Sequence, residues 1–118
     1  MTVGEYLDRL LSQAVKEEKV EIIENNYSVK LSDLVKKIVS FSDETIFLDD
    51  GPRVLSYPEI VNASSELHVD FISKGIIPLF DCNDNDFVVY SIKDNSWERF
   101  NIIDEIEFKK RAKLEEVL

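Results

Sequence analysis

Apolar residues follow a helical period at the start of the chain. Thr2 and Glu5 have the T-x-x-E spacing of a capping box, and apolar residues follow at intervals of three and four. The apolar face changes phase near residues 16–19, which predicts either one bent helix or two short ones, ending at Asn25. Ser32 is placed to cap a further helix with its own inward stripe.

The middle of the chain changes to a strand pattern. The segment "TIFLDDGPRVLSY" has β-branched and aromatic residues on both sides of the turn-forming residues 49–52, which predicts two strands and their connection. Ser56 and Glu59 again have capping-box spacing, which predicts a short helix over residues 57–66. A loop that ends at Gly75 follows.

Three strands and a helix are predicted for the rest of the chain. The strands are "IIPLF" (76–80), "DFVVYSI" (86–92) and "NSWERFNI" (95–102). The second is apolar on both faces, which indicates a central position, whereas polar and apolar residues alternate in the third and indicate greater exposure. Asp104 and Glu107 are placed to cap a last helix, which i, i+4 ion pairs would support.

These elements predict an α+β fold, an antiparallel sheet with helices packed mainly on one side. The chain has 118 residues, so we expect a single domain over residues 1–118. Because no apolar run approaches the ~20 residues of a membrane helix, and the N-terminus lacks a signal-peptide pattern, we expect no membrane association and a cytoplasmic location. The single cysteine, Cys82, forms no internal disulfide.

The net charge of -10 argues against direct binding of nucleic acid. The acidity is concentrated: residues 42–107 contain fifteen acids and four bases, whereas the flanking segments 1–41 and 108–118 are nearly balanced or basic. A concentrated negative field can steer a basic partner, and it can equally serve only to keep the protein soluble.

Asp81, Asn83 and Asn85 have the 1, 3, 5 spacing of an EF-hand loop. Asp86 stands where that loop needs Gly, and Ile92 stands where it needs a bidentate Glu, so we expect no calcium site. A hairpin connection rich in Asp and Asn is also an ordinary turn, because these side chains bond to their own backbone.

Catalytic signals are weak. His68 is the one histidine, and it could serve as the base for a Cys82 nucleophile. Both residues are more often simply packed against the protein. Asp84 and Asp86 could act as acid and base only within a pocket that raises a pKa. The three glycines are isolated and form no phosphate loop. We therefore expect no enzyme, no cofactor and no bound metal.

The order of "KLSDLVKKIVS", "TIFLDDGPRVLSYPEI" and "IIPLFDCNDNDFVVYSIKDNSWERFNI" resembles the SUKH superfamily over residues 20–108. This superfamily comprises the Smi/Knr-type regulators of yeast cell-wall synthesis and many bacterial relatives. Its motifs fall on twelve positions: Leu31, Leu55, Ser56, Ile77, Pro78, Leu79, Asp84, Asn85, Asp86, Phe87, Tyr90 and Trp97. The chain departs from the pattern at Ser32, where the family usually has Pro, and at "SFSDE", where an "NGG"-like turn is usual.

The resemblance implies an α+β fold without catalytic activity. Bacterial relatives look like immunity proteins that neutralise a toxin, often a nuclease, of a polymorphic toxin system, and fungal relatives act as regulatory modules. A nuclease presents a basic surface to its substrate, so an acidic inhibitor fits the charge pattern. We expect one basic toxin domain as the partner, and a protein that is a monomer or a weak homodimer.

The predicted partner-binding residues are five aspartates and an exposed aromatic anchor: Asp49, Asp50, Asp81, Asp84 and Asp86, with Tyr57 or Trp97. Trp97 can equally be a core residue, and each aspartate can equally be a solvated turn residue. Two other functions stay open. A regulatory or scaffolding module would bind several partners, and a protein that handles a small molecule or metal would have an enclosed pocket.

Overall fold

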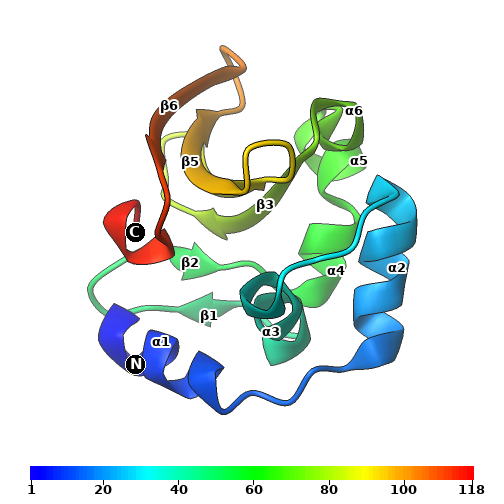
Figure 1. Cartoon of the computed structure of the whole chain (residues 1–118). Coiled ribbons are helices and arrows are strands. Elements are labelled where there is room, and N and C mark those ends of the chain that lie inside the picture. The colour runs from blue at the N-terminus through cyan, green and yellow to red at the C-terminus, as the bar shows by residue number, and fades with distance from the viewer.

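The computed structural model describes residues 1–118 and has an α+β fold in which six helices accompany one six-stranded antiparallel sheet (Figure 1). The helices are α1 (Val3–Leu11), α2 (Glu17–Tyr27), α3 (Asp33–Phe41), α4 (Tyr57–Val61), α5 (Ala63–Leu67) and α6 (Phe71–Lys74). The strands are β1 (Ile46–Phe47), β2 (Arg53–Val54), β3 (Ile76–Asp81), β4 (Asp86–Ser91), β5 (Ser96–Asn101) and β6 (Ile106–Arg111), followed by the 3-10 helix η1 (Leu114–Glu116).

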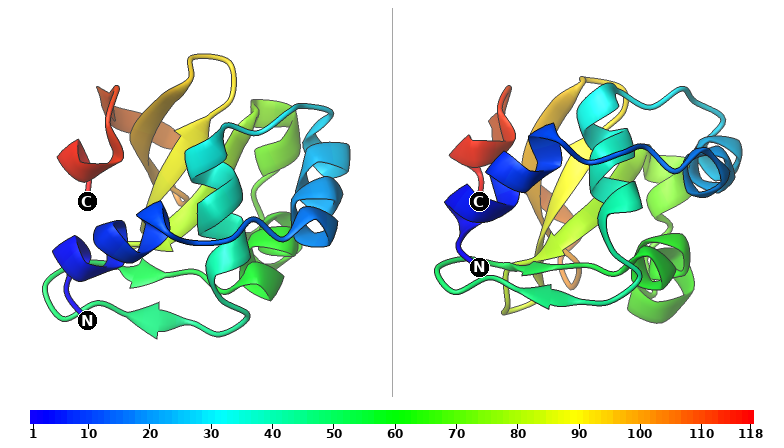
Figure 2. Two further views of the ribbon diagram at one scale, coloured as in Figure 1. Left: turned by 60° about the horizontal axis from the view of Figure 1, so that its bottom comes forward. Right: turned by 90° about the horizontal axis from the view of Figure 1, so that it is seen from below.

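The sheet is a meander with the strand order β1-β2-β3-β4-β5-β6, so β1 and β6 are its edges. Helices cover mainly one face of the sheet (Figure 2). On that face, the ring of Tyr6 in α1 packs edge-on against Phe80 of β3 at 5.9 Å. On the opposite face, Phe71 of α6 packs against Phe100 of β5, also at 5.9 Å. Strand β4 therefore lies in the centre of the core, as its two apolar faces predict.

Both predicted capping boxes are confirmed. The hydroxyl oxygens of Thr2 and Ser56 accept hydrogen bonds from the backbone N–H groups of Glu5 and Glu59, and each glutamate accepts one in return from the capping residue. Each box involves residues only three positions apart, so its geometry is local and depends little on the rest of the fold. The short helix after Ser56 nevertheless ends at Val61, and α5 follows separately.

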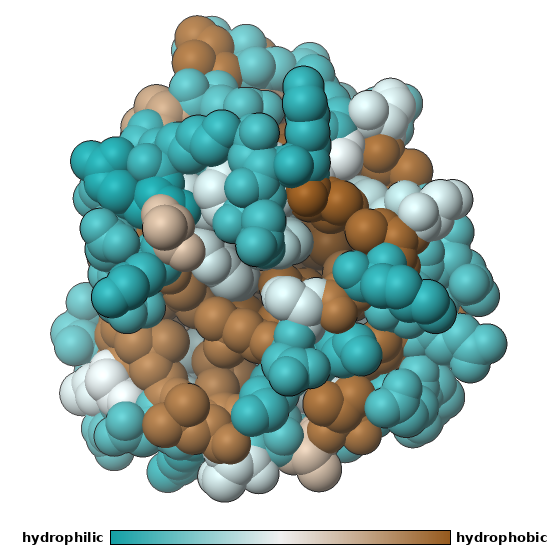
Figure 3. All heavy atoms as spheres, in the orientation of Figure 1, coloured by the Kyte–Doolittle hydropathy of each residue, from teal (hydrophilic) through white to brown (hydrophobic).

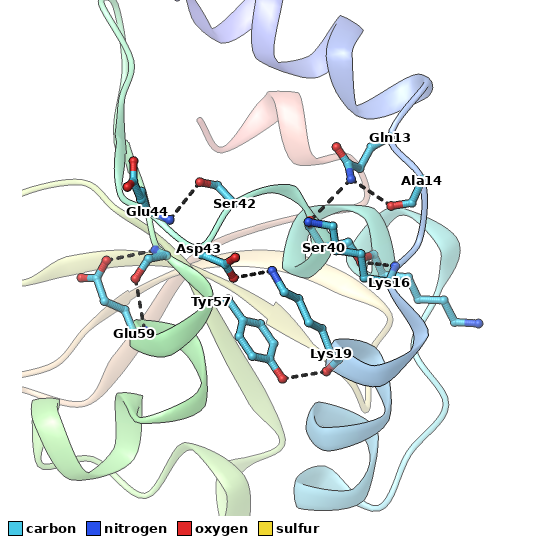
Figure 4. Close-up of polar contacts among 12 residues, drawn as sticks. Gln13, Ala14, Lys16, Lys19, Ser40, Ser42, Asp43, Glu44, Tyr57 and Glu59 are labelled. Carbon is cyan, nitrogen blue, oxygen red and sulfur yellow. Dashed lines mark hydrogen bonds and ion pairs between the residues drawn. The ribbon is translucent and has the colours of Figure 1, made fainter.

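The break between α1 and α2 is held by contacts to α3, as Figure 4 shows. The backbone N–H of Lys16 donates to the hydroxyl of buried Ser40 at 2.9 Å, and the side-chain amide of Gln13 donates to the Ser40 carbonyl. Of the two predicted alternatives, two short helices form. The predicted end at Asn25 is wrong by two residues, because α2 runs to Tyr27 and Ser28 takes the left-handed conformation.

Two predictions late in the chain are wrong. The segment before Gly75 contains the short helix α6, capped by the Asp70 carboxylate. The predicted last helix is strand β6 instead, because its backbone pairs with β5 from Asn101 opposite Ile106 to Trp97 opposite Arg111. All six residues of β6 are exposed, so no apolar stripe distinguishes a strand from a helix here.

An apolar hollow lies between α1 and η1 on the side shown in Figure 3, where hydrophobic residues gather in the lower part of the view. Leu7, Leu11, Leu34 and Leu114 line it, and Leu11 is 75% exposed. Segments near the two ends of the chain, α1 and η1, meet at this hollow, and Leu114 is buried there against the core.

No helix combines the length and the apolar character that a membrane crossing requires.

Candidate functional site

The five aspartates of the predicted acidic face lie at one end of the sheet. Arg53, the first residue of β2, pairs with Asp81, the last residue of β3. The β1–β2 connection and the β3–β4 turn therefore extend from the same end. We call this group the acidic end; it consists of Asp49, Asp50, Asp81, Asp84 and Asp86.

Two of these carboxylates are paired with cations of the chain. The Asp49 carboxylate lies 3.2 Å from the ammonium group of Met1, and the Asp81 carboxylate lies 2.9 Å from the Arg53 guanidinium. Asp49 is also held through its backbone, whose N–H donates to the Met1 carbonyl at 2.9 Å. These two residues thus have roles within the fold, whatever they bind.

The other three carboxylates have no cation partner. Asp50 accepts a hydrogen bond from the backbone N–H of Val3 at 2.7 Å, and Asp86 accepts one from the side-chain amide of Asn101 at 2.8 Å. Asp84 is exposed, and its carboxylate makes no hydrogen bond or ion pair. The acidic end therefore keeps an uncompensated negative charge, with Asp84 as its freest member.

The Asp/Asn-rich segment between β3 and β4 is a turn with an unusual backbone. Asn83, Asp84 and Asn85 have φ angles of 69°, 53° and 65°, so three consecutive residues take the left-handed conformation. Asn and Asp tolerate this conformation better than other residues with a side chain, which explains the composition of the segment. No three His, Cys, Asp or Glu side chains in the structure are grouped to hold a metal ion.

Tyr57 is half-buried between α4 and α2 (Figure 4). Its hydroxyl donates to the backbone carbonyl of Lys19 at 3.0 Å, and the Lys19 ammonium lies 5.0 Å from the centre of its ring. The same ammonium is ion-paired with Asp43. Tyr57 lies beyond the opposite end of β2 from the acidic end, so the two are not brought together.

Trp97 is only 4% exposed, and its ring packs edge-on against Tyr90 at 5.0 Å. Of the two alternatives for this residue, the core position is correct and the exposed anchor is wrong. Strand β5 is slightly more exposed than β4, as predicted, because two of its residues are partly buried against one in β4, but its first three residues are buried. Strand β6 and the C-terminal segment account for this burial, and the sequence pattern of β5 did not reveal them.

Beside the acidic end, Arg53 is the centre of a polar cluster. Its guanidinium lies 2.7 Å from the Glu59 carboxylate and 2.9 Å from that of Asp81. The Thr45 hydroxyl donates to Glu59 at 2.6 Å. We call Thr45, Arg53, Glu59 and Asp81 the Arg53 cluster. It borders a small cleft of about 80 Å³.

Every carboxylate of the Arg53 cluster has a donor. Burial would raise the pKa of Glu59, but hydrogen bonds from Thr45, the Ser56 backbone and Arg53 outweigh it and lower the pKa to about 2. The charged form of Glu59 is therefore stabilised by the fold. This arrangement is typical of a structural ion-pair network.

A second pair of carboxyl groups has the opposite character. Glu98 of β5 is 2% exposed, and its Oε2 atom has no hydrogen-bond partner. It borders a pocket of about 230 Å³ beneath β6. We call this the Glu98 pocket; it is lined by Glu98, Glu107, Phe108, Lys109 and Lys110.

The Glu98 carboxyl group is destabilised as an anion. Burial, followed by the adjacent carboxyl group of Glu107, raises the pKa of Glu98 to about 7. The Lys110 ammonium acts in the other direction, but it is engaged with Asp94 at 2.7 Å. A buried carboxyl group with a strongly raised pKa that borders a pocket is a candidate functional group.

The sequence pattern does not reveal this pair. It offers Asp84 and Asp86 as a possible acid and base instead, but the turn leaves Asp84 free and joins Asp86 to Asn101. The pattern places Glu98 on a partly exposed strand and Glu107 on a helix, so it does not bring the two together. If residues 106–111 are interpreted as an edge strand with alternating side chains, Glu107 is expected beside β5 and close to Glu98.

Cys82 and His68 form no pair. His68 is exposed at the end of α5, where it takes the left-handed conformation, and no hydrogen bond joins it to Cys82. Burial raises the pKa of the Cys82 thiol, which disfavours the reactive thiolate form.

The five surface pockets have volumes of about 80 to 370 Å³, and all of them open to solvent. None is the enclosed pocket expected of a protein that handles a small molecule. In comparisons with known proteins, no family model, curated protein or solved structure matches this chain.

Proposed function

We propose that this protein is a non-catalytic protein-binding domain, and that it acts as an immunity protein that neutralises a basic toxin domain of a bacterial polymorphic toxin system. The observation that carries the proposal is the acidic end, where two sheet connections place aspartates side by side and three of their five charges have no cation partner. The order of motifs that resembles the SUKH superfamily supports the toxin partner.

The physical reason is electrostatic. A nuclease toxin carries lysines and arginines to bind phosphates, and an uncompensated acidic surface attracts such a face and speeds association. The contact would be formed by side chains that are already held in place. Asp50 and Asp86 are each fixed by one hydrogen bond, which reduces the entropy lost on binding.

The test is a quantitative pull-down from the native cells with the tagged protein and an Asp84→Lys, Asp86→Lys variant. The matched control is Glu21→Lys, Glu66→Lys, which changes the net charge equally at exposed positions of α2 and α5. We expect one basic protein to dominate the wild-type and control samples and to be lost from the first variant. The purified protein should then inhibit the toxic activity of that partner.

A regulatory or scaffolding module is the alternative. It predicts several partners of moderate affinity, and it gains if no single basic protein dominates the wild-type sample. If one basic partner survives reversal of Asp84 and Asp86, the acidic end is not its binding site.

A further inference from the structure

The Glu98 pocket contains an acceptor that the fold leaves without a donor. Glu98 Oε2 is buried and unpartnered, and the hydroxyl of Ser96 reaches only the other oxygen, Oε1, at 3.5 Å. Buried carboxylate oxygens in folded proteins are normally satisfied by a donor. An unpaired one that borders a pocket indicates a ligand that brings donors.

The groups around Glu98 restrict the chemistry of that ligand. Glu107 and Lys110 face it from β6, and Asp94 faces it from the β4–β5 turn. Lys110 is engaged with Asp94, and Lys109 also lines the pocket, so two ammonium groups oppose three carboxyl groups and the ionised site keeps one uncompensated negative charge. The ligand is therefore a cation.

A metal ion fits poorly. Divalent cations take six or more oxygen ligands or a compact set of His, Cys and carboxylate groups, and no group of three such side chains is present. A guanidinium group fits better, because it is planar, weakly hydrated and donates parallel hydrogen bonds to carboxylates.

The surroundings of the pocket suit a protein partner. Strand β6 is the edge of the sheet and all of its residues are exposed, including Phe108, which lines the pocket and is 42% exposed. An apolar side chain beside a desolvated charged contact is typical of the centre of an interface. A partner side chain thus reaches the pocket from an open edge.

We propose that the Glu98 pocket receives an arginine side chain of a protein partner, whose guanidinium group donates hydrogen bonds to the carboxylates of Glu98 and Glu107. This inference rests on the protein-binding function proposed above and adds a contact at β6 to that of the acidic end. It selects a partner surface that projects arginine rather than lysine.

Binding would be linked to a proton. At acid pH the Glu98 carboxyl group is protonated and can donate a hydrogen bond to the neighbouring Glu107, so it needs no ligand. A guanidinium group binds only after that proton leaves. Because the pKa of free Glu98 is raised to about 7, affinity should increase with pH. With that pKa the fraction of ionised Glu98, and with it the affinity, increases on the order of thirtyfold between pH 5.5 and pH 8.

The first experiment uses blocked arginine, N-acetyl-arginine amide, without any partner protein. The side-chain carboxyl ¹³C signals of the glutamates are followed by NMR at pH 8 and pH 5.5 while the probe is added. We expect saturable shifts of Glu98 and Glu107 with a dissociation constant on the order of millimolar, as is usual for a single side chain. Blocked lysine should bind at least about fivefold more weakly.

Three variants complete the experiment. Glu98→Gln and Glu107→Gln should each abolish the saturable shifts at the remaining glutamate, whereas Glu21→Gln, the same change on the exposed face of α2, should not. Glu107 is exposed, so its substitution remains informative even if the Glu98 variant folds poorly. If Glu98 titrates near neutral pH but neither probe shifts its signal, the pair is only a proton site and the inference is wrong.

The failure of this inference can be told apart from failure of the proposed function. If blocked arginine and blocked lysine bind equally, the pocket does not select guanidinium and the arginine inference is wrong. The proposed function is still supported in that case if a basic partner is captured through the acidic end. A captured partner whose affinity is unchanged by Glu107→Gln leads to the same conclusion. Conversely, if blocked arginine binds saturably but the pull-down yields no basic partner, the arginine site is supported and the toxin-binding function is contradicted.

Discussion

The Arg53 cluster and the Glu98 pocket are both built from pairs of carboxyl groups on neighbouring elements, but they differ in what the fold supplies. In the first, one guanidinium and a hydroxyl group satisfy Glu59 and Asp81, and the pKa of Glu59 is lowered to about 2. In the second, the nearest ammonium is directed to Asp94, and the pKa of Glu98 is raised to about 7.

The presence or absence of a donor for each buried acceptor separates a structural polar cluster from a candidate binding site. A fold tolerates buried charge when every acceptor has a donor, and it is destabilised when one acceptor is left without a donor. The Arg53 cluster is complete within the chain. The Glu98 pocket lacks a donor, which is the property that a partner can supply.

The largest expected effect comes from breaking the complete cluster. Arg53→Met leaves the carboxylates of Glu59 and Asp81 partly buried and without their cation, and we expect it to lower the free energy of unfolding by about 3 kcal/mol. Urea denaturation followed by circular dichroism measures this value. A loss within about 0.5 kcal/mol, which is usual for a surface substitution, would contradict a structural role for the cluster.

The next effect has the opposite sign. Glu98→Gln removes a carboxylate that is buried without a donor, so we expect the free energy of unfolding at pH 8 to increase by about 2 kcal/mol. The same denaturation experiment, with Glu21→Gln as the control, checks it. Destabilisation at pH 8 would mean that Oε2 has a donor in solution and that the contrast with the Arg53 cluster does not exist.

The Glu98 pocket and the Arg53 cluster should also make the free energy of unfolding depend on pH in opposite directions. The fold raises the pKa of Glu98, so the stability that Glu98 contributes is present below the pKa of the unfolded chain, near 4.5. That stability is lost as the pH rises towards 7. Glu59 has a lowered pKa, so its contribution is present above 4.5 and is lost as the pH falls towards 2.

We therefore expect the free energy of unfolding to fall by about 1 kcal/mol or more on each side of a maximum between pH 4 and 5. Urea denaturation at a series of pH values checks this profile. In Glu98→Gln the decrease between pH 4.5 and 7 should disappear while the acid limb remains. If the free energy of unfolding still decreases between pH 4.5 and 7 in that variant, a group other than Glu98 causes the decrease.

The smallest expected effect is at the acidic end. Asp84→Lys changes an exposed side chain without contacts, so the free energy of unfolding should change by less than about 0.5 kcal/mol. Lysine tolerates the left-handed conformation of this position less well than Asp, which sets the sign as slightly destabilising. A loss above about 2 kcal/mol would show that Asp84 has a structural partner, and charge reversal would then be an unsuitable test of binding.

Sequence reasoning succeeded where an element depends on its own residues. The caps at Thr2 and Ser56 and the apolar strand β4 are of this kind, because a capping box involves four neighbouring residues and a doubly buried strand has no polar face. The turn at 83–85 belongs here too. Its Asn and Asp residues match a backbone of three left-handed residues.

Sequence reasoning failed for the last strand of the sheet, β6. The segment "IEFKKR" fits a helix with i, i+4 ion pairs as well as it fits an exposed strand. The partners that form are distant ones instead: Glu105 pairs with Lys74 at 3.2 Å, and Lys110 pairs with Asp94. Because the sequence pattern predicts a helix for residues 106–111, it does not predict the burial of Glu98 beside β6, and it leaves the burial of Trp97 as one of two alternatives.

The α+β class, the positions of the central strands along the chain and the concentration of acids in residues 42–107 follow from the amino-acid sequence alone. These properties depend on periodicity, local capping and composition, which are written along the chain. The tertiary structure decided which carboxyl groups find a donor. That outcome depends on long-range pairing, such as Arg53 with Asp81 and β6 with β5, because a carboxylate that would be solvated in an extended chain is buried or satisfied only by residues brought to it.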